Sequence, residues 1–481
     1  MRSSGLVLSL AFPVALAAAA SACGGDGTAG ASAAPDAGDD VPTIDGGAPD
    51  HDVTTKPAGP RVSFLTLNLH GYHAMDEAPR FFEDESSGAL TPAISSPFYF
   101  TLDELFRGNT KRLDALAADL RARLPDVIAL QEVAAGAPDT SRDCAAFTAD
   151  TPGDEPHTNT ALRLARRLAK EGYQAVLGCR GNVGWTTDPG TFASRRIVRK
   201  KGDVVFDFGE SPYPDGILVE GFALLVRSPI EVLTHEVLDV PHGPKGERIK
   251  AQIAALRLPR ANASDEESPV IAVVNVHGGH KLAHFEQAVA LRAAVSAWMT
   301  SEKVATGRVV FLGDFNARLH RPNEKGVLEE AASAPWEIKV EGQFDYVDPE
   351  DGAASQKLAD ALLALNASSY KSFATLPEPE AKTRIDAAIA QLRSWQRSEK
   401  TTPVLHEALF TSSGRGACKP PTDGHGACSV DARIDHVFFG GSFEVAESYA
   451  LYTHHDDHRL AGTFTDHPGI AAVLALPPAP R

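Results

Sequence analysis

Short apolar runs, each ending in a polar residue, recur along residues 62–476. FLTL precedes Asn68, and DVIALQ precedes Glu132. VIAVVNV precedes His277, and VVFLG precedes Asp314. Short apolar runs bounded by polar residues are typical of buried strands. Many strands with few intervening helices predict an α/β fold in which two sheets pack face to face with helices outside.

A second pattern, apolar residues at helical spacing, appears between some of the strands. Residues 109–124, 158–170 and 282–299 carry it, and we expect each of them to form a helix. Residues 322–402 look less regular and mostly helical, with helices expected at 357–365 and 382–397. We interpret residues 322–402 as an insertion in a domain that spans residues 61–478.

The first 22 residues read as an export signal. Arg2 supplies a short positive region, residues 6–20 are almost wholly apolar, and small residues precede Cys23. The apolar run is too short to span a bilayer comfortably. Small residues ending in cysteine resemble a bacterial lipoprotein box, so we expect lipidation at Cys23 and anchoring to the cell envelope. Ordinary cleavage at the same bond, giving a secreted or periplasmic protein, is the alternative.

Residues 23–60 differ in composition from the rest of the chain. They are rich in Gly, Ala, Asp, Pro and Thr and contain almost no large apolar side chains. Such a segment buries too little apolar surface to offset the entropy of ordering it. We expect a disordered tether, with the lipid anchor as the only contact with a membrane.

The charge balance limits the classes of partner. With 46 basic and 63 acidic residues, the net charge is −17. An acidic protein gains no long-range attraction toward nucleic acid or anionic membranes, which disfavours a tight non-specific DNA binder. It does not exclude an enzyme that handles phosphates through a bound cation, because the cation supplies local positive charge.

Four cysteines besides Cys23 are available for disulfides, namely Cys144, Cys179, Cys418 and Cys428. An even number in an exported chain favours two bonds. Neighbourhood in the sequence favours Cys144–Cys179 and Cys418–Cys428, although four cysteines allow three connectivities. Unpaired buried thiols are the alternative.

The polar residues at the strand ends resemble, as an ordered set, the endonuclease/exonuclease/phosphatase superfamily. In chain order they are Asn68 in LTLNL, Glu132 in ALQEV, His277 in NVHGGH, Asp314 and Asn316 in GDFNA, Asp435 in RIDHVFF, and Asp466 with His467 in TDHPGI. The superfamily includes DNase I-type nucleases, bacterial sphingomyelinases and inositol-polyphosphate phosphatases. The resemblance implies a DNase I-like four-layer α/β sandwich and metal-dependent hydrolysis of phosphate esters.

The same resemblance implies a set of ligands for a divalent cation. Glu132 would be the principal ligand, with Asn68 beside it, and Asp466 would complete this site or hold a second ion. Carboxylate and amide oxygens suit a hard cation, so the expected cofactor is Mg²⁺ or Mn²⁺, as one or two ions.

Catalytic roles also follow from the resemblance. Asp314 would orient or deprotonate the attacking water, and Asn316 would hydrogen-bond the phosphate or the nucleophile. His467 would contact the phosphate, with Asp435 fixing its tautomer. His277 would stabilise the charged phosphoryl oxygens or protonate the leaving group.

Three classes of function are compatible with this resemblance. A nuclease acting on phosphodiester bonds outside the cytoplasm is favoured, with nucleic acid as the substrate and a monomer as the expected state. A phosphoesterase for lipid head groups or inositol phosphates is the alternative. A non-catalytic binding module on the same fold ranks last, because every expected position carries a suitable residue. Fold alone does not decide between them.

The lipid anchor gives a first prediction. Replacing the acylated residue by Cys23→Ser should release the protein from the membrane fraction or stall its processing. Each buried methylene of an acyl chain contributes about 0.8 kcal/mol to membrane binding, and serine cannot form the thioether. Cell fractionation and the mass of the mature protein measure this. Unaltered fractionation together with unaltered mass would refute lipidation.

Overall fold

The structure is a computed structural model that describes fifteen stretches of the chain. They are residues 59–69, 81–83, 90–92, 110–137, 144–148, 159–186, 217–243, 245–260, 268–316, 335–336, 351–368, 375–398, 405–407, 435–451 and 469–477. All of them fall within one compact unit, Pro57–Ser368 with Thr375–Arg481. The predicted export signal, Cys23, Cys418, Cys428, Asp466 and His467 lie outside the described residues.

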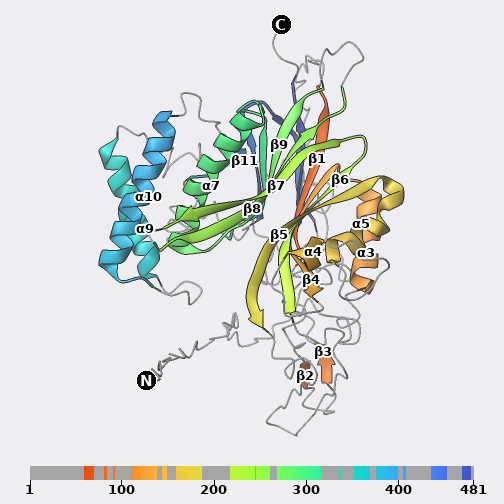
Figure 1. The fold of residues 1–481 in the computed structure, drawn as a ribbon, viewed down its shortest axis with the longest axis horizontal. Coiled ribbons are helices and arrows are strands. Elements are labelled where there is room, and N and C mark those ends of the chain that lie inside the picture. The colour runs from red at the N-terminus through yellow and green to blue at the C-terminus, as the bar shows by residue number, and fades with distance from the viewer. Residues whose placement is uncertain are drawn as a thin grey trace, which may run out of the picture. The chain divides into compact units, whose positions relative to one another are not determined.

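Two six-stranded sheets form the centre of the described chain (Figure 1). In spatial order the first holds β13 (Glu444–Leu451), β14 (Gly469–Ala475), β1 (Arg61–Asn68), β4 (Val127–Ala137), β6 (Ile217–Arg227) and β5 (Tyr173–Thr186). The second holds β11 (Leu405–Glu407), β12 (Asp435–Gly440), β10 (Val309–Asp314), β9 (Val270–His277), β8 (Glu247–Arg257) and β7 (Glu231–His242). A short hairpin of β2 (Phe81–Glu83) and β3 (Leu90–Pro92) is separate from both.

Helices cover the outer face of each sheet (Figure 1). The first sheet packs against α3 (Thr110–Arg123), α4 (Ala145–Thr148), α5 (Thr160–Arg167) and η1 (Ala169–Glu171). The second packs against α7 (Lys281–Ser301), and α7 in turn packs against α9 (Gly352–Ala367) and α10 (Glu378–Ser398). The two helices expected inside residues 322–402 are therefore present, each longer than predicted. None of the described helices is long and apolar enough to cross a membrane.

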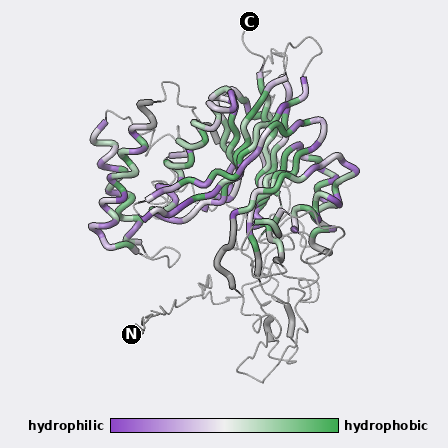
Figure 2. The backbone as a smooth tube through the Cα atoms, viewed as in Figure 1, coloured by the Kyte–Doolittle hydropathy of each residue, from purple (hydrophilic) through white to green (hydrophobic). Residues whose placement is uncertain are grey.

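The apolar side chains of the described residues gather in four clusters, three between the layers of the sandwich and one between α7 and the inserted helices. Phe64 and Val273 belong to the cluster between the sheets. Leu65 packs with α3 and α5 beneath the first sheet, and Val274 packs with α7 beneath the second. The fourth cluster joins α7 to α9 and α10. Figure 2 shows the central strands as the most hydrophobic part of the molecule. The predicted four-layer α/β sandwich is confirmed.

The sheets share one pattern of strand directions. Each contains one parallel pair, β1 with β4 and β9 with β10, and the other pairs are antiparallel. Asn68 is in register with Gln131 in the first pair, and His277 is in register with Asp314 in the second. The carboxyl ends of parallel strands meet at one edge of a sheet, so each pair delivers its terminal polar residues to one place.

Neutral polar side chains cross the space between the sheets just below these strand ends. Gln131 Nε2 donates to Thr66 Oγ1 at 3.0 Å and to Asn275 Oδ1 of the other sheet at 2.7 Å. Asn275 Nδ2 lies 3.0 Å from the Leu130 carbonyl and 3.1 Å from the Ala223 carbonyl. These amides are fully buried, and their hydrogen bonds join the two sheets across the interior.

This amide network predicts a loss of stability on Asn275→Leu. The change keeps the volume but leaves buried carbonyls and the Gln131 amide without their partner, at a cost of about 1–3 kcal/mol for each stranded group. Urea unfolding measures it. Glu231→Gln on the exposed end of β7, which removes a surface ion pair with Arg257, should change stability by under about 1 kcal/mol. Equal stability of the two variants would contradict the network's role.

Candidate active site

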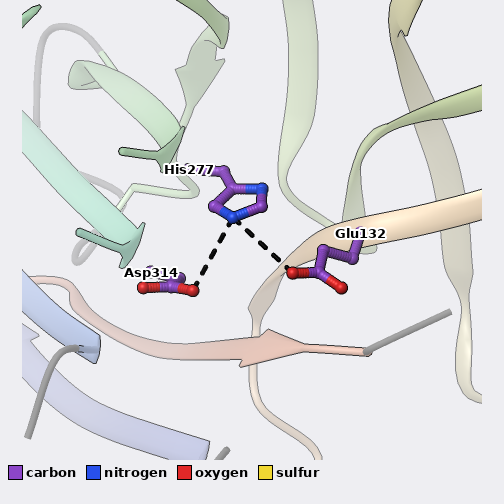
Figure 3. Close-up of side chains that lie close together, drawn as sticks. All are labelled: Glu132, His277 and Asp314. Atoms are coloured by element: carbon purple, nitrogen blue, oxygen red, sulfur yellow. Dashed lines mark ion pairs between the residues drawn. The ribbon is translucent and has the colours of Figure 1, made fainter. Parts of the chain in front are cut away.

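Four polar side chains meet at the carboxyl ends of the two parallel pairs. We call Asn68, Glu132, His277 and Asp314 the central cluster. Asn68 Nδ2 lies 3.0 Å from Glu132 Oε1 and 3.1 Å from Asp314 Oδ2. His277 Nε2 lies 3.6 Å from Glu132 Oε1 and 3.8 Å from Asp314 Oδ2 (Figure 3). All four residues are buried, so two carboxylates from different sheets share one amide and one imidazole.

A β-bulge aims Glu132 into this cluster. Leu130 pairs with Ala223 and Val133 pairs with Gly221, so Gln131 and Glu132 together oppose one residue of β6. Glu132 has φ 49°, in the left-handed region that side chains rarely adopt. Gln131 and Glu132 consequently both face the other sheet, as the contacts of Gln131 with Asn275 and of Glu132 with His277 show. The sequence predicted a strand ending at Glu132, and this is wrong, because β4 continues through the bulge to Ala137.

The GDFN sequence builds the other half of the cluster. A Cβ on Gly313 would lie 1.9 Å from the Val276 carbonyl oxygen, so only glycine allows β10 to approach β9 here. Phe315 is buried in the core beneath the second sheet. Asn316, at φ 51°, donates its backbone N–H to Asp314 Oδ1 at 2.8 Å. Its side-chain Nδ2 donates to the Gly278 carbonyl at 3.0 Å, which ties the turn to the loop after His277.

Two further charged residues contact His277, and the sequence alone did not identify them as site residues. Glu220 of β6 is buried, and its Oε1 lies 3.5 Å from His277 Nδ1. Arg180 Nη1 of β5 lies 3.1 Å from Glu220 Oε1 and 2.9 Å from His277 Nδ1. Glu220 had a usable signal, a lone acid inside the apolar run ILVEGFALLVR. Arg180 in LGCRGN had none that distinguishes it from a surface arginine.

Neighbouring charges shift the pKa values of both Glu220 and His277. Burial raises the pKa of Glu220, but its contact with His277 and the charge of Arg180 outweigh burial and hold that pKa below its ordinary value. Burial and Arg180 lower the pKa of His277. The contact with Glu220 and the two carboxylates of the central cluster prevail, so the His277 pKa lies above its ordinary value.

Asp435 is fully buried and is the β12 residue in register with Asp314. His436, the next residue, packs its ring 5.8 Å from Phe315 and 5.4 Å from Phe438, centroid to centroid. The ring of His436 therefore belongs to an aromatic cluster. The roles assigned to Asp435 with His467, and to Asp466 as a ligand, stay predictions.

The central cluster suits a divalent cation. One ligand atom from each of Glu132, His277 and Asp314 can be chosen so that all three lie within 4.8 Å of one another. Two buried carboxylates repel each other strongly in a poorly polarisable interior, and a cation compensates both. Carboxylate oxygens are ligands of hard cations, and imidazole broadens the choice toward transition metals.

The family model for the "Endonuclease/Exonuclease/phosphatase family" matches residues 65–467 of this sequence. The chain belongs to this family. The resemblance inferred from the strand-end residues is thereby confirmed, and the fold is that of a phosphoesterase superfamily. No curated protein matches the sequence.

Solved structures with a similar fold are distant in sequence. An endonuclease/exonuclease/phosphatase from Beutenbergia cavernae DSM 12333 is 16% identical, with a TM-score of 0.38 over 87% of this chain and 72% of that chain. ANGEL2, a 2′,3′-cyclic phosphatase, is 13% identical, with a TM-score of 0.45 over 88% of this chain and 98% of that chain. TDP2 from C. elegans is 13% identical, with a TM-score of 0.35 over 86% of this chain and 75% of that chain.

A disulfide anchors the strand that carries Arg180. Cys144, at the start of α4, is bonded to Cys179 of β5, with their Cα atoms 5.7 Å apart. This is one of the two pairings that sequence neighbourhood favours. Register in β5 shifts between Cys179 and Gly181, so Arg180 sits in an irregularity directly after the bonded cysteine. The disulfide therefore holds the backbone next to the guanidinium.

This disulfide gives a stability prediction. Its cysteines are 35 residues apart, and cross-links closing loops of this size contribute about 2–4 kcal/mol. We expect the double variant Cys144→Ser, Cys179→Ser to lose stability by that amount in urea unfolding under oxidising conditions. A reducing agent should lower the free energy of unfolding of the wild type by breaking this bond. It cannot lower that of the variant in the same way, because the variant lacks the bond. Equal stability of oxidised wild type and variant would contradict the assignment.

Proposed function

We propose that this protein is a divalent-metal-dependent phosphoesterase that hydrolyses phosphodiester bonds, with nucleic acid as the favoured substrate. The observation that carries the proposal is the convergence of Glu132 and Asp314, from two different sheets, on one amide and one imidazole. Membership of the family supports a phosphate-ester substrate. Packing alone does not account for this cluster, because burying two like charges together is unfavourable.

Mg²⁺ or Mn²⁺ fits the oxygen ligands of this site. Glu132 and Asn68 would hold the ion, and Asp314 is near enough to share in binding it. The bound ion would neutralise charge on the phosphoryl oxygens and lower the pKa of nearby water. Asp466 remains a proposed ligand for the same ion or for a second one.

The residues in and around the central cluster would have separate roles in catalysis. Asp314 accepts hydrogen bonds from Asn68 and from the Asn316 backbone, which fixes its carboxylate for orienting and deprotonating water. The contact with Glu220 and the carboxylates of Glu132 and Asp314 raise the pKa of His277 and so favour its protonated form. His277 would donate this proton to a phosphoryl or leaving oxygen. Glu220 holds the far side of the imidazole, and Arg180 restrains Glu220.

We further propose that the enzyme acts outside the cytoplasm, attached to the cell envelope through Cys23. The apolar leader and the Cys144–Cys179 bond support an oxidising location. The net charge of −17 gives no long-range attraction to nucleic acid, so substrate binding would depend on local charge, namely the metal and Arg180.

The proposal predicts cation-dependent hydrolysis. We expect purified residues 60–481 to cleave plasmid DNA with Mg²⁺ or Mn²⁺ and to stop in EDTA. Asp314→Asn should lower kcat by about 10²–10⁴-fold, as expected for removing a general base. Its melting temperature should stay near that of the wild type, because one of two repelling charges is removed.

The matched control is Asp239→Asn, the same substitution on exposed β7, which should leave kcat unchanged. Sphingomyelin vesicles and inositol polyphosphate serve as parallel substrates. Cleavage of one of these alone would move the substrate to the lipid or inositol class. Failure on all three, with wild type and Asp314→Asn indistinguishable, would count against catalysis.

A further inference from the structure

The loop that follows His277 is held from two sides. On the side of the central cluster, Gly278 donates its N–H to the Asp314 carbonyl at 2.8 Å and accepts from Asn316 Nδ2 at 3.0 Å. On the side of α7, Gly279 donates its N–H to Gln287 Oε1 at 2.7 Å. Gln287 of α7 thus holds the backbone two positions after His277 by accepting the Gly279 N–H.

The contact between Gly279 and Gln287 is close and specific. A Cβ on Gly279 would lie 2.9 Å from Gln287 Oε1, so a larger residue here would displace the end of the Gln287 side chain. Gln287 Nε2 lies 3.3 Å from His242 Nε2, which sets the orientation of the amide with its oxygen toward the loop.

Glu286, the residue before Gln287, ties α7 to the inserted helix α10. Arg384 of α10 makes two hydrogen bonds to the buried carboxylate of Glu286, and one of them, from Nε to Oε1, is 2.8 Å long. Arg384 Nη1 also donates to Glu247 Oε1 at 2.9 Å, and His242 Nδ1 lies 3.8 Å from Glu286 Oε2. One arginine of the insertion therefore joins the β7–β8 hairpin and α7.

The first residue of α7 has a second link to the insertion. Lys281 has φ 52°, and its Nζ donates to the Ser368 carbonyl at the C-terminal end of α9 at 2.7 Å. Beneath these polar contacts, Phe285 and Val289 of α7 pack with apolar side chains of α9 and α10. Both inserted helices thus hold the beginning of α7.

We propose that Gln287 is a positioning residue for His277, and that α9 and α10 form a brace that holds Gln287 and the loop in place. The brace acts at a distance from the reacting atoms, so its effect should appear in kcat rather than in substrate binding. A displacement of about 1 Å in a catalytic group lowers rates by about 10²-fold. The catalytic part of this inference rests on the proposed function, whereas the bracing of the loop does not.

The test compares Gln287→Met, which removes the acceptor at similar volume, with Gln287→Glu, which keeps an oxygen at that position. For Gln287→Met we expect kcat on the substrate cleaved by the wild type to fall about 10–100-fold, with KM within twofold. Gln287→Glu should recover most of this loss. Amide hydrogen exchange should become faster in residues 278–281 of Gln287→Met and stay unchanged in β4.

The double variant Glu286→Met, Arg384→Met tests the brace without leaving a buried charge unpaired. It should also speed exchange in residues 278–281. Unchanged exchange in Gln287→Met, or unchanged kcat with faster exchange, would overturn the inference. A wild type that cleaves none of the substrates would refute the proposed function and with it the positioning role, while hydrogen exchange would still decide whether the loop is braced.

Discussion

Burial of negative charge between the two sheets is the constraint on which the rest of the structure depends. The interior changes character along its length, from apolar residues such as Phe64 to the amides around Asn275, and then to the central cluster. Removing a carboxylate from water costs several kcal/mol unless hydrogen bonds and opposite charge compensate it. The amide layer separates the apolar core from the charges and gives the sheets fixed partners just beneath the site.

Local backbone strain accompanies the placement of the polar groups at the site. Glu132 and Asn316 both adopt left-handed conformations, Glu132 inside the bulge of β4 and Asn316 in the turn after β10. Such conformations cost about 1–3 kcal/mol each and persist where the surrounding structure determines them fully. Here the determinants are visible, since a bulge in β4 places Glu132 and two hydrogen bonds hold Asn316. Two of the five described non-glycine residues with positive φ thus lie at the site.

The sequence predicted the ends of β1, β9 and β10 correctly, because alternation and burial are local properties. Asn68, Glu132, His277 and Asp314 each follow an apolar run, and the structure brings all four together. The bulge at Glu132 was not predictable, because it depends on pairing with β6, about ninety residues away in the chain. Arg180 was missed for a similar reason, since its role depends on contacts with two other strands. The contribution of the insertion lies in contacts of Arg384 that no local pattern encodes.

The site draws on both sheets, and each half has its own anchor. Arg180 and Glu220 come from the first sheet, where the Cys144–Cys179 bond holds β5 directly before Arg180. His277 comes from the second sheet, where α7 holds the following loop through Gln287. The anchors share no residue and lie on opposite faces of the sandwich, so their contributions to stability should add. Their effects on catalysis need not add, because both converge on the same imidazole, Arg180 at its Nδ1 and the loop at its backbone.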